Sequence, residues 1–218
     1  SIIARLKKFN FHLEVELPNG EFEAVLVKKD DRVLEKLEIK SQKEAQKIVE
    51  DLKGANWQVR SIERKRVSKN PLPPFTTSTL QQKAFRRLGF SAKQTMLFAQ
   101  QLYEGMEIGE EGPVGLITYM RTDSLSISNE ALAEAQDFLK KEIGQNYTIP
   151  TPRRFKTKSK LAQEAHESIR PTSSWRQPEL IKQFLNPRQA KLYELIWRRF
   201  LASQMPQAVF DSTSVDIK

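Results

Sequence analysis

The four residues Pro71-Leu72-Pro73-Pro74 divide this 218-residue sequence into two parts with different residue patterns. Proline lacks a backbone hydrogen-bond donor and restricts the conformation of the residue before it. Neither a regular strand nor a regular helix is therefore expected to continue through this stretch. We place a domain boundary here, with a first domain over residues 1–73.

Residues 1–73 follow mainly the alternating pattern of β-strands. The turn sequence Pro18-Asn19-Gly20 separates two alternating runs, which predicts a hairpin. A capping box at Ser41 and Glu44, with Gly54 beyond the last turn, predicts a short helix. The expected elements are the hairpin over 11–26, the helix over 42–53 and a strand over 56–67.

The residues after the prolines follow a helical pattern. Serine and threonine stand at cap positions, and apolar residues recur at helical spacing. The first of these helices begins at a cap formed by Thr77 or Ser78. The predicted helices span 77–88, 92–104, 129–143, 161–169, 178–185 and 188–204. Residues 106–115 and 145–160 are expected to be loops, because glycine and acids fill the first and basic residues fill the second.

The strand pattern returns at the end of the sequence, over residues 207–218. A chain that leaves a β domain and later returns to it inserts one domain into another. The predicted fold class is α+β, with a β-rich domain formed by residues 1–73 and the return strand 205–218, and a mainly helical domain, 74–204, inserted into it. The abrupt beginning and the strand pattern that stops at Lys218 lead us to expect a piece of a longer protein.

Composition excludes several classes of protein. The chain has no cysteine and two histidines, which excludes a disulfide framework, a thiolate nucleophile, a zinc ribbon and a multi-histidine metal site. No apolar run approaches the roughly 20 residues that span a bilayer, so we expect a soluble, cytoplasmic protein with no membrane partner. The formal charge of +9 includes basic clusters over 60–69 and 153–160. These clusters predict an anionic partner such as nucleic acid, although solvated faces or loops would also account for them.

The main chemical candidate lies within Gly115–Ser124, where Tyr119 is followed two residues later by Arg121. In extended backbone, positions i and i+2 face the same side, so both side chains could meet one phosphate. A phenol with a pKa of about 10 is a poor nucleophile, and a nearby guanidinium favours its ionised form and binds phosphate in a bidentate fork. Taken alone the pair is weak evidence, because a tyrosine is more often part of a core or an interface.

Three segments, in this order along the chain, together resemble the type IA DNA topoisomerase family. The tyrosine segment resembles the family's active-site motif over eight positions, and the third segment departs from the family's signature only in Ser168, where the family has alanine. The segments are Pro74-Phe75-Thr76-Thr77-Ser78-Thr79-Leu80-Gln81-Gln82, Ile117-Thr118-Tyr119-Met120-Arg121-Thr122-Asp123-Ser124 and Ala165-His166-Glu167-Ser168-Ile169-Arg170-Pro171-Thr172.

The resemblance implies a reaction for Tyr119. In the family, the matching tyrosine attacks a phosphodiester in one DNA strand and becomes linked to the 5′ phosphate, and the ester is later religated without ATP. Arg121 matches the arginine that contacts the scissile phosphate. A second strand passes through the opened gap, which relaxes negative supercoils. Such motion needs hinges, expected near Pro71–Phe75 and Ser203–Gln207.

The resemblance also implies contacts with a single-stranded segment of DNA. The implied DNA-binding residues are Ser78, Thr79, Gln81, Thr122, Asp123, Ser124, His166 and Arg170. Several of them have an alternative structural role: Ser78 and Thr79 as helix caps, and His166 as a buried structural histidine. Arg170 binds a phosphate or pairs with Glu167, and Asp123 is expected to orient Arg121 or the loop backbone.

Family members hold Mg²⁺ in a separate TOPRIM domain, whose Asp-x-Asp motif is absent from this sequence. No metal site is therefore expected in this chain, and we expect that it does not relax DNA without the remaining domains of the enzyme.

A noncatalytic nucleic-acid-binding module is the alternative from another class. A reverse gyrase or a decatenating enzyme is an alternative within the family. A tyrosine recombinase is disfavoured, because its chemistry needs several Arg and His residues around the tyrosine. The family's association with DNA implies a location at the nucleoid.

Overall fold

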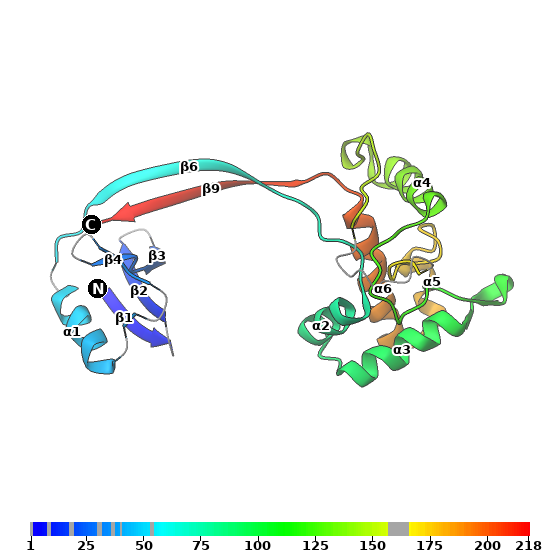
Figure 1. The fold of residues 1–218 in the computed structure, drawn as a ribbon, viewed down its shortest axis with the longest axis horizontal. Coiled ribbons are helices and arrows are strands. Elements are labelled where there is room, and N and C mark those ends of the chain that lie inside the picture. Colours follow the sequence, from blue (N-terminus) through cyan, green and yellow to red (C-terminus); the bar gives the residue numbers. More distant parts are fainter. Residues whose placement is uncertain are drawn as a thin grey trace. The chain divides into compact units, whose positions relative to one another are not determined.

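The computed structural model describes residues 2–7, 10–17, 20–29, 32–35, 38–39, 41–52, 55–156 and 166–218 (Figure 1). The chain forms two compact units, one comprising Ser1–Arg64 with Thr213–Lys218 and the other comprising Lys65–Ser212. We call them the β unit and the helical unit. Small antiparallel sheets and separate helices make up the described residues, which confirms the α+β fold class.

The β unit contains the predicted hairpin. Three antiparallel strands lie in the order β1-β2-β3, and Leu17 pairs with Gly20 at the end of the hairpin. The turn residues 18 and 19 lie outside the described residues. The predicted helix is confirmed as α1, which buries Ala45 and Ile48. The elements are β1 (Ile2–Lys7), β2 (Asn10–Leu17), β3 (Gly20–Val25), β4 (Lys28–Lys29), β5 (Arg32–Val33) and α1 (Gln42–Leu52).

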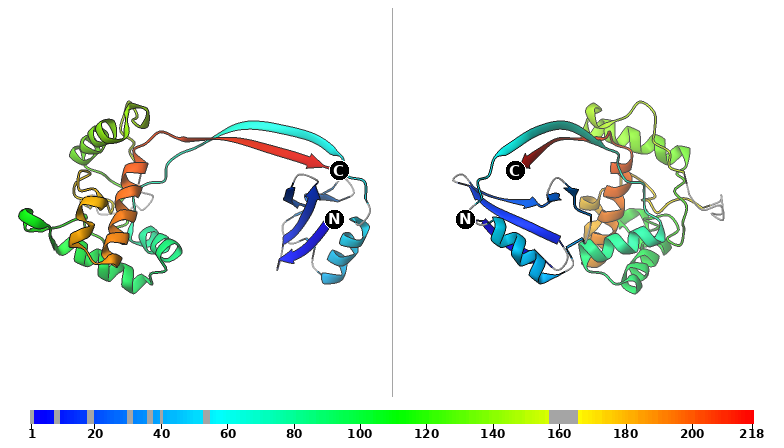
Figure 2. Two further views of the ribbon diagram at one scale, coloured as in Figure 1. Left: turned by 180° about the vertical axis from the view of Figure 1, so that it is seen from behind. Right: turned by 60° about the vertical axis from the view of Figure 1, so that its left-hand side comes forward.

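Two long strands, β6 (Val59–Lys69) and β9 (Ala208–Ile217), pair as a ribbon that belongs partly to each unit. Figure 2 shows them side by side in both views. At one end, Gln58 and Lys218 exchange two backbone hydrogen bonds of 2.8 and 2.9 Å. Both predicted strands are therefore confirmed. The division between the units falls inside this ribbon rather than at the prolines, and the domain limits at 73 and 204 stay predictions.

The helical unit contains the predicted helices other than 161–169, with several changes at their ends. The helix after Ser128 continues from α4 into a π-helical segment, η2, before Gly144. The elements are α2 (Thr77–Leu88), α3 (Ala92–Glu104), β7 (Met106–Glu107), η1 (Gly109–Glu111), β8 (Pro113–Val114), α4 (Asn129–Phe138), η2 (Leu139–Ile143), η3 (Gln145–Tyr147), α5 (Pro178–Ile181), η4 (Lys182–Phe184) and α6 (Pro187–Ser203).

Three expectations for this unit were wrong. The cap of α2 is Thr76, because its side chain accepts from the Thr79 amide while the Thr79 hydroxyl accepts from the Thr76 amide. The expected loop 106–115 contains the paired strands β7 and β8. Residues 166–169 are not helical, since Ile169 forms a β-bridge with Phe75. The rest of that expected helix, 161–165, lies outside the described residues.

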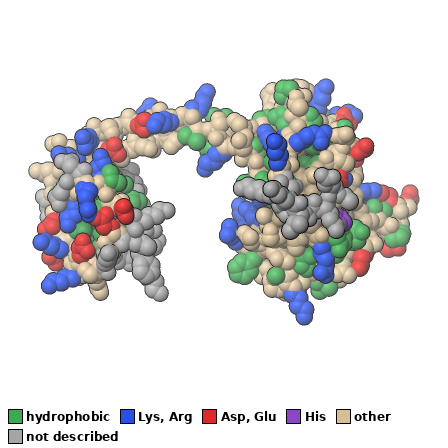
Figure 3. All heavy atoms as spheres, in the orientation of Figure 1, with side chains coloured by type: hydrophobic (Ala, Val, Ile, Leu, Met, Phe, Trp, Pro, Cys, Tyr) green, Lys and Arg blue, Asp and Glu red, His purple; other side chains and the backbone are tan. Residues whose placement is uncertain are grey.

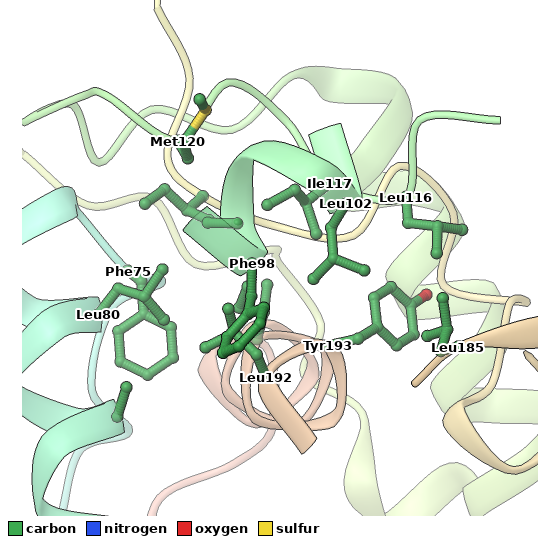
Figure 4. Close-up of a cluster of buried hydrophobic side chains, with 14 of the residues drawn as sticks. Phe75, Leu80, Phe98, Leu102, Leu116, Ile117, Met120, Leu185, Leu192 and Tyr193 are labelled. Atoms are coloured by element: carbon green, nitrogen blue, oxygen red, sulfur yellow. The ribbon is translucent and has the colours of Figure 1, made fainter. Parts of the chain in front are cut away.

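The main core of the helical unit lies between α2, α3, α6 and the segment around Ile117 (Figure 4). Ile117 and Met120, on either side of Tyr119, are both buried in it. Tyr193 of α6 is fully buried, and its hydroxyl donates a 2.7 Å hydrogen bond to the Arg176 carbonyl. Burial raises the pKa of the Tyr193 phenol well above its ordinary value. The core therefore fixes the backbone on both sides of Tyr119.

Candidate active site

The three sequence motifs meet in the helical unit through backbone pairing. The segment around Ile169 lies between the other two, because Ile169 forms an antiparallel bridge with Phe75 and Pro171 forms one with Ile117. The Ile169 amide donates to the Phe75 carbonyl at 2.8 Å, and the Thr118 amide donates to the Arg170 carbonyl at 3.0 Å. Segments more than 40 residues apart in the sequence thereby become neighbours.

Thr77 fixes the loop that carries Tyr119 and Arg121. Its hydroxyl donates to the Met120 carbonyl at 2.8 Å and accepts from the Thr122 amide at 2.9 Å. Its own amide donates to the Thr122 carbonyl at 2.9 Å. These bonds attach the loop to the first turn of α2 on both sides of Arg121. The role of Thr77 was missed at the level of sequence, although the residue lies inside the first motif.

A cleft of about 580 Å³ opens beside this loop. Tyr119, Arg121 and Asp123 come from the loop, Ser78 comes from α2, and His166 comes from the third motif. The loop is bent rather than extended, so the i and i+2 argument for extended backbone does not apply to it. Tyr119 and Arg121 nevertheless line the same cleft. The full lining is Thr77, Ser78, Tyr119, Arg121, Thr122, Asp123 and His166.

Two aromatic rings hold the Tyr119 ring. Tyr103, at the end of α3, meets it edge-on with ring centroids 5.4 Å apart, and His166 lies 5.6 Å away at a tilt of 31°. Tyr119 is 37% exposed, and within the described residues its hydroxyl has no hydrogen-bond partner. The ring is therefore positioned by its neighbours while the phenol oxygen stays available to a ligand.

A close backbone approach places the tyrosine loop against α3. The Leu116 amide donates to the Leu102 carbonyl at 2.7 Å. A Cβ atom on Gly115 would lie 2.8 Å from the Tyr103 carbonyl oxygen, closer than real side chains come. Glycine at position 115 is thus required for Tyr103 and Tyr119 to lie side by side. Tyr103 gave no signal of this role in the sequence.

Glu167 and Arg170 form an ion pair within the third motif. The guanidinium donates to the Glu167 carboxylate from two nitrogens and to the Pro171 carbonyl at 2.9 Å. The other oxygen of Glu167 accepts from the Ser128 amide at 2.6 Å. Of the two roles that the sequence left open for Arg170, the geometry favours pairing with Glu167. The pair fixes the third motif against the start of α4.

The cleft gathers some of the expected DNA-binding residues and leaves out others. Ser78, Thr122, Asp123 and His166 line it together with the two expected catalytic residues, Tyr119 and Arg121. Thr79, Gln81, Ser124 and Arg170 do not line the cleft. Thr79 serves the cap of α2, and Ser124 is buried, where its hydroxyl accepts from the Ser126 amide.

Arg121 is exposed and has no internal anion. Within the described part of the chain, neither its guanidinium nor the Asp123 carboxylate makes a hydrogen bond or an ion pair. The expectation that Asp123 orients Arg121 or the loop backbone therefore finds no contact to support it. The Thr77 hydroxyl orients the loop instead.

The second basic cluster has a structural role at its start. The Arg153 guanidinium donates to the Ser203 and Met205 carbonyls at 2.6 and 2.9 Å, and so binds the end of α6. Arg154 donates to Asn129 beside the start of α4. Residues 157–160 of the cluster lie outside the described residues. A cation at the C-terminus of a helix is stabilised by the helix dipole. Arg153 therefore has a structural role that does not depend on binding nucleic acid.

Comparison with known proteins places this chain in a family. A family model described as DNA topoisomerase matches residues 5–218. The chain belongs to the DNA topoisomerase family. It is 47% identical over 204 residues to DNA topoisomerase 1 of Rickettsia felis, and 43% identical over 212 residues to DNA topoisomerase 1 of Xylella fastidiosa. These matches cover 93% and 96% of this chain and 26% of each relative.

The fold of this topoisomerase chain agrees with a solved relative. The structure of full-length topoisomerase I from Thermotoga maritima matches with a TM-score of 0.68 at 31% identity, covering 100% of this chain and 31% of that one. The type IA class that the three motifs indicated is thereby confirmed. The chain spans about a quarter of the length of its curated relatives.

Two further properties follow from the described residues of this topoisomerase chain. None of their helices combines the length and the apolar character needed to cross a membrane. No three of their His, Asp and Glu side chains come together in a group that could hold a metal ion. The described residues thus do not fit a magnesium site.

Proposed function

We propose that this chain carries the strand-cleaving centre of a type IA DNA topoisomerase. The Tyr119 phenol oxygen attacks a DNA phosphorus and forms a 5′-phosphotyrosine ester. The phenol gives up its proton, the bond between phosphorus and the 3′ oxygen breaks, and that oxygen leaves as a 3′ hydroxyl after it takes a proton. Reversal of the same exchange religates the strand. Because the new phosphotyrosine ester retains the free energy of the broken phosphodiester bond, religation needs no ATP.

The observation that supports this proposal is the composition of the cleft. A half-exposed tyrosine without a hydrogen-bond partner among the described residues stands beside an unpaired arginine. The Arg121 guanidinium suits a phosphate oxygen, where it would stabilise charge that develops during the attack. His166, stacked near Tyr119, would help to position the strand. The substrate is proposed to be a single-stranded segment of DNA.

The relatives named DNA topoisomerase 1 favour relaxation of negative supercoils over a reverse gyrase or a decatenating activity. We propose that the Mg²⁺ of the intact enzyme is held by residues that this chain does not supply, and no step is assigned to the metal here. Because the proposed substrate is DNA, we also propose that the enzyme lies in the cytoplasm, associated with the nucleoid.

The test is replacement of Tyr119 by phenylalanine in the intact enzyme. Tyr119→Phe removes only the nucleophilic oxygen, so the covalent DNA adduct should disappear while affinity for single-stranded DNA is retained. Denaturing gels detect the adduct, and a filter or polarisation assay measures binding. Tyr147→Phe is a matched control, because Tyr147 is 52% exposed and lies outside the cleft. Absence of an adduct in the unsubstituted enzyme would favour a noncatalytic binding module.

We expect the 218-residue chain alone not to relax supercoiled DNA. It contains the proposed nucleophile but, within its described residues, no group of metal ligands. Gel electrophoresis of supercoiled plasmid incubated with the purified chain and magnesium measures this. Relaxation that Tyr119→Phe abolishes would contradict the expectation, and addition of the remaining domains should restore activity.

A further inference from the structure

Arg176 connects three parts of the helical unit outside the cleft. Its backbone carbonyl accepts a 2.7 Å hydrogen bond from the hydroxyl of Tyr193, whose side chain is fully buried in the core. Its guanidinium donates to the Thr172 hydroxyl at 3.1 Å and to the Glu111 carboxylate at 2.9 Å. Thr172 ends the third motif, and Glu111 lies between the short strands β7 and β8. No pattern in the sequence indicated these contacts of Arg176.

The hairpin formed by β7 and β8 places an acid beside Arg176. Its strands pair antiparallel, and Ile108 between them is buried in the core. A Cβ atom on Gly109 would lie 3.4 Å from the Phe184 ring, so this part of the hairpin packs against η4. Figure 3 shows acidic side chains at the edge of the helical unit where α3 ends and the hairpin begins. The packed hairpin holds Glu111 within ion-pair distance of Arg176.

Thr172 connects Arg176 to the segment that leads to Tyr119. Its hydroxyl donates to the Gly115 carbonyl at 2.7 Å, and its amide donates to the Leu116 carbonyl at 3.0 Å. Thr172 is exposed, so water competes for its hydroxyl. Because Arg176 donates to the oxygen of this hydroxyl, the hydroxyl hydrogen is left for the Gly115 carbonyl, and the two bonds polarise and strengthen each other.

The position of Gly115 determines how Tyr103 meets Tyr119. Gly115 approaches the Tyr103 carbonyl so closely that no Cβ atom fits between them, and the Tyr103 ring packs edge-on against the Tyr119 ring. A displacement of the Gly115 carbonyl therefore changes the contact between the two rings. The bond from Thr172 opposes such a displacement.

Arg176 is not placed to bind DNA in the cleft. It is not one of the residues that line the cleft, and its side chain is only 24% exposed. Both of its terminal nitrogens already donate to protein oxygens, and its Nε is buried without a partner among the described residues. An effect of Arg176 on the reaction must therefore pass through the residues that it contacts.

We propose that Arg176 is a positioning residue for Tyr119, which acts through the Thr172 hydroxyl on the Gly115 carbonyl. The core fixes the backbone of Arg176 through Tyr193, and the hairpin fixes its guanidinium through Glu111. This inference rests on the proposed function, in which Tyr119 is the nucleophile. The rate of adduct formation therefore depends on Arg176, whereas the affinity for DNA does not.

The test compares adduct formation by variants of the intact enzyme at saturating single-stranded DNA. Arg176→Gln removes the guanidinium, Thr172→Val removes the hydroxyl, and Thr172→Ser keeps it. Arg198→Gln is the matched control, because Arg198 forms a similar ion pair with Glu194 within α6. Polarisation measures DNA affinity, hydrogen exchange follows the Thr172 amide, and circular dichroism melting verifies that each variant folds.

The expected rates follow the order of the contacts. Adduct formation should slow by about tenfold in Thr172→Val and by about fivefold in Arg176→Gln, in which Thr172 keeps its own bond to Gly115. The double variant should be no slower than Thr172→Val alone, because both substitutions act at one carbonyl. Thr172→Ser and Arg198→Gln should match the unsubstituted enzyme. DNA affinity should stay unchanged in every variant, and the Thr172 amide should exchange faster in Arg176→Gln.

Several outcomes would overturn the role of Arg176. Equal rates in Arg176→Gln and Arg198→Gln would do so, as would losses that multiply in the double variant. Weaker DNA binding by Arg176→Gln would make Arg176 a DNA contact instead. If Arg176→Gln does not fold, equal rates in Thr172→Val and Thr172→Ser would overturn the path through the hydroxyl.

Failure of the proposed function would look different. The unsubstituted enzyme would then form no adduct, while the faster exchange of the Thr172 amide in Arg176→Gln would persist.

Discussion

At the scale of single residues, Ser168 departs from the family motif and has a clear structural consequence. Its side chain is fully buried, and among the described residues its hydroxyl has no hydrogen-bond partner. A buried polar group without a partner loses its hydrogen bonds to water and forms no replacement, which lowers the free energy of unfolding. The alanine that the family carries here would avoid this loss.

Ser168→Ala is therefore expected to stabilise the helical unit, raising the free energy of unfolding by about 1 kcal/mol. Chemical denaturation followed by circular dichroism measures the change. Ser128→Ala provides a control of opposite sign, because the Ser128 hydroxyl caps α4 by accepting from the Ala131 amide at 3.3 Å. Its loss should lower the free energy of unfolding by about 1 kcal/mol. A destabilised Ser168→Ala variant would contradict the assignment of an unsatisfied hydroxyl.

At the scale of elements, the start of α2 determines the conformation of the tyrosine loop. Helix α2 begins at Thr77 because Thr76 and Thr79 form a reciprocal capping box. That start places the Thr77 hydroxyl between the Met120 carbonyl and the Thr122 amide. A helix cap thus positions two loop residues more than 40 positions later in the sequence. We regard Thr77 as a positioning residue for Tyr119 and Arg121.

Thr77→Val keeps the shape of the side chain and removes the hydrogen bonds that its hydroxyl makes with the Met120 carbonyl and with the Thr122 carbonyl and amide. The Thr122 amide should lose hydrogen-exchange protection, and adduct formation at saturating DNA should slow by about tenfold, because small displacements of reacting groups reduce rates strongly. Affinity for DNA should stay within a factor of about two, since the substitution removes no charged group that could bind a phosphate. Thr79→Val, which perturbs the cap alone, is the comparison. Unchanged protection at Thr122 would show that the loop does not depend on Thr77.

At the scale of the whole molecule, the two expected hinges lie in segments that several hydrogen bonds attach to the helical unit. Near Pro71–Phe75, the Arg199 side chain binds the Pro73 carbonyl and Phe75 pairs with Ile169. Near Ser203–Gln207, the Arg153 side chain binds two carbonyls and the Gln204 side chain bonds the Arg153 backbone. The ribbon β6–β9 is exposed along almost its whole length. These contacts favour bending in the ribbon over bending at the two crossings.

Hydrogen exchange tests this arrangement. The amides of Ile169, Gln204 and Met205, which are bonded at the crossings, should exchange as slowly as those of α6, whereas ribbon amides should exchange faster. Arg153→Ala should speed exchange at Gln204 and Met205, and Arg154→Ala serves as its neighbour control. Fast exchange at both crossings in the unsubstituted chain would instead support hinges near Pro71–Phe75 and Ser203–Gln207.

Most of the elements were predictable from local sequence, because caps, turn residues and apolar periodicity act over a few neighbouring positions. Ser91 and Ser128 begin helices, as predicted, and the two ribbon strands are close to their predicted limits. The failures occurred where distant segments competed with local preference. Ile169 has helical spacing with its neighbours, yet it pairs with Phe75. The cleft residues Tyr119 and Arg121 were found from their motif, whereas Tyr103 was not.

The sequence by itself determined the class of fold, the family, and the tyrosine and arginine that the proposed reaction needs, because short motifs preserve the chemistry and local patterns specify helices and strands. Only the tertiary structure decided which side chains surround Tyr119, that Arg170 pairs with Glu167, and that the start of the second basic cluster fastens α6. The physical reason is that the partners of Tyr119 and of Arg153 come from other segments of the chain, and that the Ser128 amide, 39 positions away, holds the Glu167 carboxylate that pairs with Arg170. Their geometry depends on how the core packs, which no local pattern records.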